Sequence, residues 1–115
     1  MKMLLILNDA PYGSERTYNG LRLAGSLARQ QGELKLFLMG DAVASAKSGQ
    51  KVPPGYYNAQ NMVGAVVRHG GRVGACGTCI DARGISEAEL LEGVHRSSLE
   101  ELTLWTTEAE KVLVF

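Results

Sequence analysis

Apolar residues in this chain form short continuous runs that alternate with stretches of helical periodicity. Continuous runs are typical of strands buried on both faces of a sheet, and they occupy residues 2–7, 34–39, 72–76 and 111–115. Apolar side chains at helical spacing predict amphipathic helices over residues 15–31 and 57–69, each followed by glycine. Strands that alternate with helices in this way indicate a parallel sheet.

Serine and glutamate pairs mark helix starts in the second half of the chain. Ser86 and Glu89 have the spacing of a capping box, which predicts a helix through the leucines that follow. Ser98 and Glu101 form a second box at the start of an expected C-terminal helix. Residues 94–96, between the two, are expected to form a brief strand. These elements predict a three-layer α/β/α fold with a parallel sheet of about five strands.

The length and the charge balance narrow the class of protein. A chain of 115 residues fits a single domain, which we place at residues 1–115. Twelve basic and twelve acidic residues cancel without a basic stripe, so we expect no nucleic-acid partner. No apolar run approaches the roughly 18 residues of a membrane span, so we expect no membrane partner. The apolar start is too short for a signal peptide, and we expect a cytoplasmic protein.

The most informative residues are the two cysteines, Cys76 and Cys79, directly after the strand predicted at 72–76. The carboxyl ends of strands are where open α/β sheets bind ligands and substrates. A thiolate is favoured there by backbone N–H groups and by nearby cations, for which Arg72 and Arg83 are the candidates. Cys79 is close enough in sequence to resolve a modified Cys76 into a disulfide, or to receive sulfur from it.

Four interpretations of these thiols remain open from the residues alone. Cys76 could carry or transfer sulfur as a persulfide, with Cys79 as its partner. The pair could instead cycle between dithiol and disulfide. A zinc site with His69 and His95 is a third possibility, although neither histidine has zinc-finger spacing. In the fourth, both cysteines are small buried residues without chemistry. We expect no cofactor and no resident metal.

Several polar residues are candidates for positioning the thiolate. Asn8 and Tyr12 follow the first strand, whose carboxyl end opens on the same sheet edge as the cysteines. Together with the amide of Gly77, they are our candidate hydrogen-bond donors to Cys76. Asp81 and Arg83 are expected to pair with each other or to lock the cysteine loop.

The motifs as a set closely resemble those of the DsrE/DsrF sulfur-relay family, and specifically its YchN-like branch. The resemblance covers essentially the whole chain in order and spacing. It rests on Asn8, Ala10-Pro11-Tyr12-Gly13-Ser14-Glu15, Leu21-Arg22-Leu23-Ala24, Leu36-Phe37-Leu38-Met39, Asp41-Ala42-Val43, Gly55-Tyr56-Tyr57-Asn58, Cys76-x-Thr78-Cys79-x-Asp81-x-Arg83-Gly84-Ile85-Ser86 and Ala109-x-Lys111-Val112-Leu113-x-Phe115.

This resemblance implies a function and an assembly. Sulfur-relay members of the family carry a persulfide on a cysteine at this strand end, and Cys76 matches that cysteine, whereas Cys79 matches only the YchN-like branch. The family forms homo-oligomers, commonly a hexamer built as a dimer of trimers, so a trimer or hexamer is expected here. The implied partners are proteins that donate and accept sulfur, and the implied activity is that of a sulfur carrier or sulfurtransferase.

Overall fold

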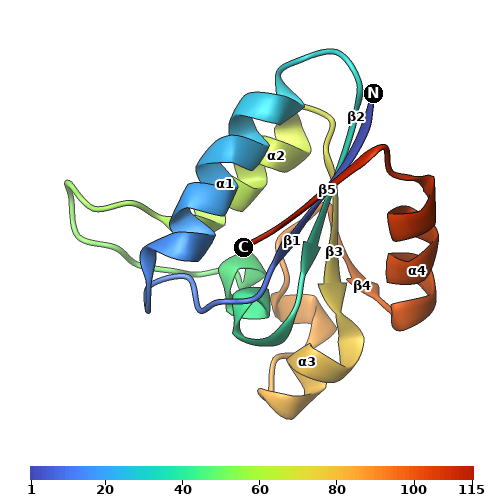
Figure 1. Cartoon of the computed structure of the whole chain (residues 1–115). Coiled ribbons are helices and arrows are strands. Elements are labelled where there is room, and N and C mark those ends of the chain that lie inside the picture. Colours follow the sequence, from blue (N-terminus) through green and yellow to red (C-terminus); the bar gives the residue numbers. More distant parts are fainter.

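A five-stranded sheet with the order β4-β3-β2-β1-β5 organises the structure, a computed structural model that describes residues 1–115 (Figure 1). All four strand pairings are parallel, as the sequence predicts. The strands are β1 (Lys2–Leu7), β2 (Glu33–Leu38), β3 (Arg72–Cys76), β4 (Val94–Ser97) and β5 (Lys111–Val114). The α-helices are α1 (Glu15–Ala28), α2 (Ala59–Arg68), α3 (Gly77–Ala82) and α4 (Leu99–Glu108), and the 3-10 helices are η1 (Gly40–Ala46) and η2 (Glu87–Glu89).

The helices cover both faces of the sheet, which confirms the three-layer prediction. Figure 1 shows α1 and α2 on one face and α4 on the other, while α3 lies beyond the ends of the strands. The chain moves from β1 through β2 and β3 to β4 in one direction, then returns to the opposite edge at β5. Because parallel crossovers are right-handed, this reversal places α4 on the face opposite α1 and α2.

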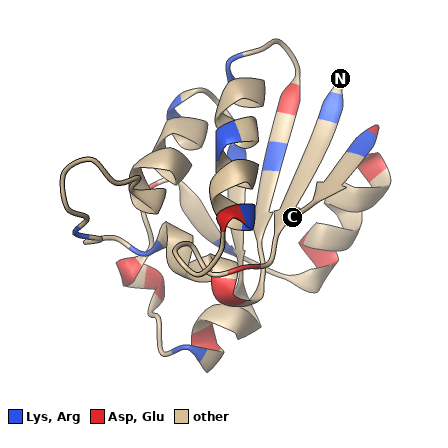
Figure 2. Cartoon of the chain, turned by 60° about the vertical axis from the view of Figure 1, so that its left-hand side comes forward, with Lys and Arg blue, Asp and Glu red and all other residues tan.

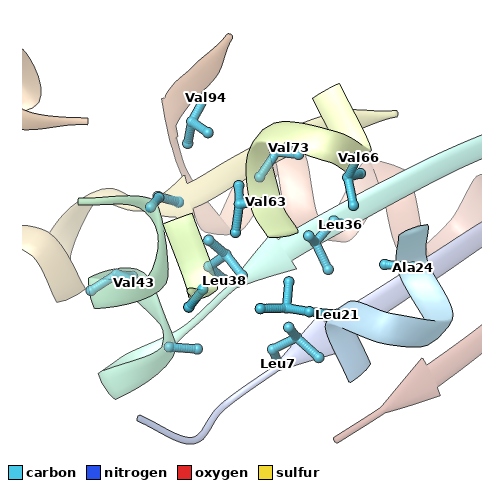
Figure 3. Close-up of a cluster of buried hydrophobic side chains, with 14 of the residues drawn as sticks. Leu7, Leu21, Ala24, Leu36, Leu38, Val43, Val63, Val66, Val73 and Val94 are labelled. Atoms are coloured by element: carbon cyan, nitrogen blue, oxygen red, sulfur yellow. The ribbon is translucent and has the colours of Figure 1, made fainter. Parts of the chain in front are cut away.

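The larger hydrophobic core lies between the sheet and the α1–α2 layer (Figure 3). Figure 3 shows Leu7, Leu36 and Val73 of three neighbouring strands pointing toward the side chains of the helical layer. Leu21 of α1 and Val63 of α2 meet them there, and both are buried. This core fixes the register of the central strands, and therefore the place at which each strand ends.

A smaller core anchors α4 to the other face of the sheet. It consists of Leu4, Phe37, Leu102 and Trp105. The Phe37 and Trp105 rings meet edge to face with centroids 6.2 Å apart. Gly74 of β3 leaves room for this arrangement, since a Cβ there would lie 3.2 Å from the Trp105 ring and 3.0 Å from Ser97 Cβ. Trp105 thus joins the helix to the strand that carries Cys76.

Several predicted boundaries are wrong. Helix α1 ends at Ala28 rather than residue 31, because a turn precedes Gly32, where φ is +130° and Met1 O lies 2.7 Å from the position of a Cβ. Helix α2 is also shorter than predicted, because the Asn58 side chain caps it by accepting a hydrogen bond from the Asn61 amide.

The two serine–glutamate pairs behave differently from each other. The Ser86–Glu89 capping box is present, but it opens only the 3-10 turn η2, so the helix predicted through the leucines is wrong. Ser98 caps α4 by accepting from the Glu101 amide. The Glu101 carboxylate does not return to Ser98, however, but binds His95 and Ser97 of β4. Only half of this predicted capping box forms, because tertiary contacts bind the glutamate side chain.

Charged residues are interspersed over helices, strands and loops in Figure 2.

The last strand, β5, differs from the other apolar strands because all four of its residues are exposed at the sheet edge. None of the helices combines the length and the hydropathy that crossing a bilayer requires.

Candidate functional site

Cys76 is the last residue of β3 and the N-cap of α3, so it lies where the sheet gives way to a helix. This position confirms that the strand delivers the thiol to its carboxyl end. Cys79 lies within α3 rather than in a loop, one helical turn from Cys76. Residues with this separation share a face of a helix, and the two thiols shift each other's pKa. Both cysteines are free and half-buried.

The hydrogen bonds around Cys76 favour its thiolate. Burial raises the pKa of the Cys76 thiol, but hydrogen bonds from the Cys79 thiol, the Thr78 hydroxyl and the amides of Cys79 and Thr78 together bring it below its ordinary value. The Thr78 Oγ1 atom lies 3.4 Å from Cys76 Sγ. Cys76 therefore has the character of the nucleophile of the pair.

Cys79 has the opposite character. Burial and the hydrogen bond to Cys76 raise the pKa of the Cys79 thiol, although the Gly40 amide, which donates to its sulfur at 3.2 Å, opposes the change. A thiol with a raised pKa keeps its proton and can donate it to the neighbouring thiolate. The two thiols are therefore unequal, because Cys76 loses its proton more readily than Cys79 does.

An open groove of about 620 Å³ gives access to the thiols. Cys76, Thr78 and Cys79 line one side of it, and the first turn of α4 lines the other. Phe37 and Met39 contribute apolar surface at its floor. Leu99, at the rim, is 71% exposed. The groove is therefore large enough for the end of an extended peptide or for a small molecule to reach the sulfur.

Two ion pairs hold α3 against the rest of the fold. Arg96 of β4 binds Asp81 through both Nη atoms, each 2.8 Å from a carboxylate oxygen. Arg83 binds Asp41 of η1 through Nε and Nη2, and its Nη1 donates to the Cys79 carbonyl. The expectation that Asp81 and Arg83 pair with each other is wrong, but both do lock the segment that carries the cysteines.

The cation beside the thiols also differs from the prediction. Arg72 lies at the opposite end of β3 from Cys76, and its guanidinium packs 5.6 Å from the Trp105 ring centroid. Arg83 acts on Cys79 rather than on Cys76. Arg96, which the sequence analysis missed, lines the groove and faces Gly77. Its position near the carboxyl end of a strand beside β3 is the signal that could have identified it.

Asn8 and Tyr12 do not bind the thiolate in this structure, so their predicted roles are wrong. The Asn8 side chain donates to the Phe115 carbonyl at 3.1 Å and ties the C-terminus to the end of β1. The Tyr12 hydroxyl donates to the Gln50 side chain and accepts from the Ala59 amide. Tyr12 instead lines a separate pocket of about 470 Å³ with Tyr56 and Tyr57.

The backbone amides that act on Cys76 also differ from the predicted one, that of Gly77. The amides that lower the pKa of the Cys76 thiol are those of Cys79 and Thr78, and not that of Gly77. The contribution of Gly77 is steric, because a Cβ there would lie 2.9 Å from Cζ and Nε of Arg96. No group of three or more His, Cys, Asp and Glu side chains is arranged to hold a metal ion, so the residues expected for zinc do not converge.

Comparison with known proteins identifies the family. The sequence model of the DsrE/DsrF-like family matches residues 1–115. The chain belongs to this family. It is 46% identical to protein YchN of Escherichia coli K12 over 99% of its own length and 98% of that protein. It is 36% identical to protein MK0008 of Methanopyrus kandleri over 96% of its length and 91% of that protein.

Solved structures agree with this assignment. The crystal structure of YchN from E. coli superimposes with a TM-score of 0.94 at 45% identity, covering 100% of this chain and 99% of that one. The structure of MTH1491 from Methanobacterium thermoautotrophicum superimposes with a TM-score of 0.78 at 17% identity, over the full length of both chains. The second likeness concerns the fold alone. The family and the α/β fold expected from the sequence are therefore confirmed.

Proposed function

We propose that this protein is a sulfur carrier in which Cys76 accepts sulfur as a persulfide and passes it on. The observation that carries the proposal is the Cys76 sulfur itself. Hydrogen bonding with Cys79 and Thr78 outweighs burial and lowers the pKa of its thiol, its Sγ lies 3.4 Å from the Thr78 hydroxyl oxygen, and it opens into a groove that a donor can enter. Membership of the DsrE/DsrF-like family supports the assignment to sulfur relay.

The reaction is a transfer of sulfane sulfur between thiols. The Cys76 thiolate attacks the outer sulfur of a donor persulfide, R–S–SH, so that a new S–S bond forms as the donor S–S bond breaks. The products are Cys76–S–SH and the donor thiolate, R–S⁻, without net oxidation. An acceptor thiolate then attacks the outer sulfur in the same way and regenerates the Cys76 thiolate.

Cys79 supports the carrier in the resting state and offers a second route of release. Its thiol donates to the Cys76 sulfur and stabilises the negative charge there. If the Cys79 thiolate attacks the inner sulfur of the persulfide, a Cys76–Cys79 disulfide forms and HS⁻ leaves. An external dithiol must then reduce the disulfide before another cycle.

A homo-oligomer would shelter the persulfide from solvent. Apolar side chains are exposed on the α4 face and along the β5 edge, with Leu99 71%, Leu104 53% and Val114 63% accessible. Leu99 also lies at the rim of the Cys76 groove. A second copy packed on this face would cover both the apolar surface and part of the groove, and a trimer or hexamer in the cytoplasm fits this arrangement.

Mass spectrometry after incubation with glutathione persulfide tests the proposal. The expected result is a gain of one sulfur atom on Cys76 that is lost in Cys76→Ser and retained in Cys79→Ser. The loaded protein should then convert an added small thiol into its persulfide. If the Cys79→Ser variant, which cannot release sulfur through an internal disulfide, gains no sulfur, the carrier function is excluded and a small-molecule binding module is favoured.

A second candidate function, cycling between dithiol and disulfide, is favoured by the position of the two thiols one helical turn apart, where each shifts the pKa of the other. In that case the same experiment would show the loss of two hydrogen atoms without added sulfur. The Cys79→Ser variant separates the two functions, because it can still carry sulfur on Cys76 but cannot form the internal disulfide.

A further inference from the structure

We propose that Arg96 is a specificity residue of the Cys76 groove, and that it selects sulfur donors with a negative charge next to the transferable sulfur. The inference rests on the proposed function of Cys76. It concerns a residue of β4 that comes twenty positions later in the sequence.

The first observation is where the guanidinium lies. Ala75 and Cys76 of β3 are in register with Arg96 and Ser97 of β4, so Arg96 lies beside the end of the strand that carries the thiol. Atoms Cζ and Nε of Arg96 occupy the space where a side chain at residue 77 would begin, 2.9 Å from the position of its Cβ. Gly77 is the residue after Cys76, so the absence of a side chain lets a cation from another strand lie against the backbone next to the thiol.

The second observation is that only part of the guanidinium is neutralised. Asp81 accepts from both Nη atoms and fixes the plane of the group. The Nε–H group makes no hydrogen bond within the protein, and Nε is one of the atoms nearest Gly77. Asp81 therefore orients Arg96 while leaving a charged donor free on the side of the residue that follows Cys76.

The third observation concerns the charges that line the groove. Arg96 is the only basic residue in its lining, and Glu100, on the first turn of α4, is the only acidic one. The pKa of Arg96 is raised, mainly by its hydrogen bonds to Asp81, and the charges of Glu87 and of the Cys76 thiolate add to this effect. An incoming anion meets the free Nε–H group on the Gly77 side, whereas an incoming cation is repelled by Arg96.

The chemistry of sulfur transfer gives this arrangement a role. The Cys76 thiolate and an anionic donor repel each other as the S–S bond forms, because two negative charges approach within bonding distance. A cation beside the sulfur reduces this repulsion, and it also stabilises the persulfide anion, Cys76–S–S⁻, that results. The donors favoured are persulfide or thiosulfonate anions. Neutral donors gain less from Arg96, because their approach to the thiolate involves no repulsion between two negative charges.

Charged methanethiosulfonates test the inference, because a thiolate attacks their sulfur just as it attacks a sulfur donor. The measurement is the rate constant at Cys76 for the anionic sulfonatoethyl reagent divided by that for the cationic trimethylammonioethyl reagent. All proteins carry Cys79→Ser, so that Cys79 cannot displace the adduct. We expect Arg96→Gln to lower this ratio about threefold at low ionic strength, and less in high salt, because Asp81 already neutralises part of the charge.

Two further variants serve as controls. Arg96→Lys keeps the charge and should restore most of the ratio. Lys47→Gln removes the same charge from another exposed ion pair, that with Glu89 at 3.4 Å, and should leave the ratio unchanged. An Arg96→Gln ratio equal to that of the parent, or a fall of the same size in Lys47→Gln, would overturn the inference.

This test is independent of sulfur loading. If the parent protein shows the expected ratios but never takes up sulfur from glutathione persulfide, the carrier function is wrong and the electrostatic role of Arg96 stands. If sulfur loads on Cys76 while Arg96→Gln leaves the ratio unchanged, the carrier function stands and the role of Arg96 is wrong.

Discussion

Trp105→Ala should be among the most destabilising substitutions in this protein. Trp105 is 2% exposed and is the largest side chain between α4 and the sheet. It meets Phe37 edge to face, and the Lys35 ammonium lies 5.6 Å from its ring centroid. Gly74 leaves room for the edge of the indole, because a Cβ there would lie 3.2 Å from the ring.

The magnitude follows from these contacts. Truncating a buried aromatic residue to alanine costs about 3–5 kcal/mol, and the loss of the edge-to-face pair accounts for about 1 kcal/mol of that. We expect Trp105→Ala to lie near 4 kcal/mol, a large share of the roughly 5–15 kcal/mol that stabilises a typical domain. Trp105→Phe keeps an aromatic ring in the site and should cost about 1–2 kcal/mol.

Urea unfolding followed by far-ultraviolet circular dichroism measures these differences, at one protein concentration because oligomerisation couples to stability. Thr103→Ala provides the control, since Thr103 is exposed on the same helix and its removal should change the free energy of unfolding by less than about 0.5 kcal/mol. If Trp105→Ala moves the unfolding midpoint no further than Thr103→Ala does, α4 is not anchored as described, and neither is its wall of the Cys76 groove.

Three further predictions follow from the same structure. Cys79→Ala removes a donor to the Cys76 sulfur, so the pH midpoint for alkylation of Cys76 by iodoacetamide should rise, and an unchanged midpoint would remove Cys79 from the thiolate's support. The pKa of Glu101 is lowered, because hydrogen bonds from Ser97 and His95 outweigh the opposing effect of burial. The contribution of Glu101 to stability is therefore present above its pKa in the unfolded chain and is lost as the pH falls through its pKa in the folded protein. Glu101→Gln should lower the free energy of unfolding at pH 7 but much less in acid below about pH 4, as measured by urea unfolding. Gly74→Ala should cost about 1–3 kcal/mol, because its Cβ would lie 3.0 Å from Ser97 Cβ. Gly25→Ala in α1 should stabilise by about 0.5–1 kcal/mol, because no atom lies within 4 Å of the new Cβ. Thermal unfolding measures both variants, and equal shifts in their melting temperatures would contradict this prediction.

Local patterns predicted much of the architecture. The runs at residues 2–7 and 72–76 became strands with those bounds, because a continuous apolar segment of that length can be buried only inside a covered sheet. The predictions failed where an element's end depends on distant contacts. The helix expected after Ser86 is only a 3-10 turn, and the last apolar strand lies exposed at the sheet edge, although its composition is that of a buried strand.

The candidate site shows the same division. The place of Cys76 at the end of β3 and its proximity to Cys79 could be predicted, since both depend on a few consecutive residues. The partners of the charged and polar side chains could not. Asn8 binds the C-terminal residue and Arg83 binds Asp41, while Arg96, which had no predicted role, lies against Gly77.

The amino-acid sequence alone determined the alternation of strands and helices along the chain, the family, and which strand end carries the two thiols, because periodicity and motif spacing are properties of neighbouring residues. Only the tertiary structure decided which cation lies against Gly77, which amides lower the pKa of Cys76 and which surfaces enclose the groove. Long side chains such as Arg96 choose among several rotamers, and that choice depends on the space and the charges supplied by segments that are distant in the sequence.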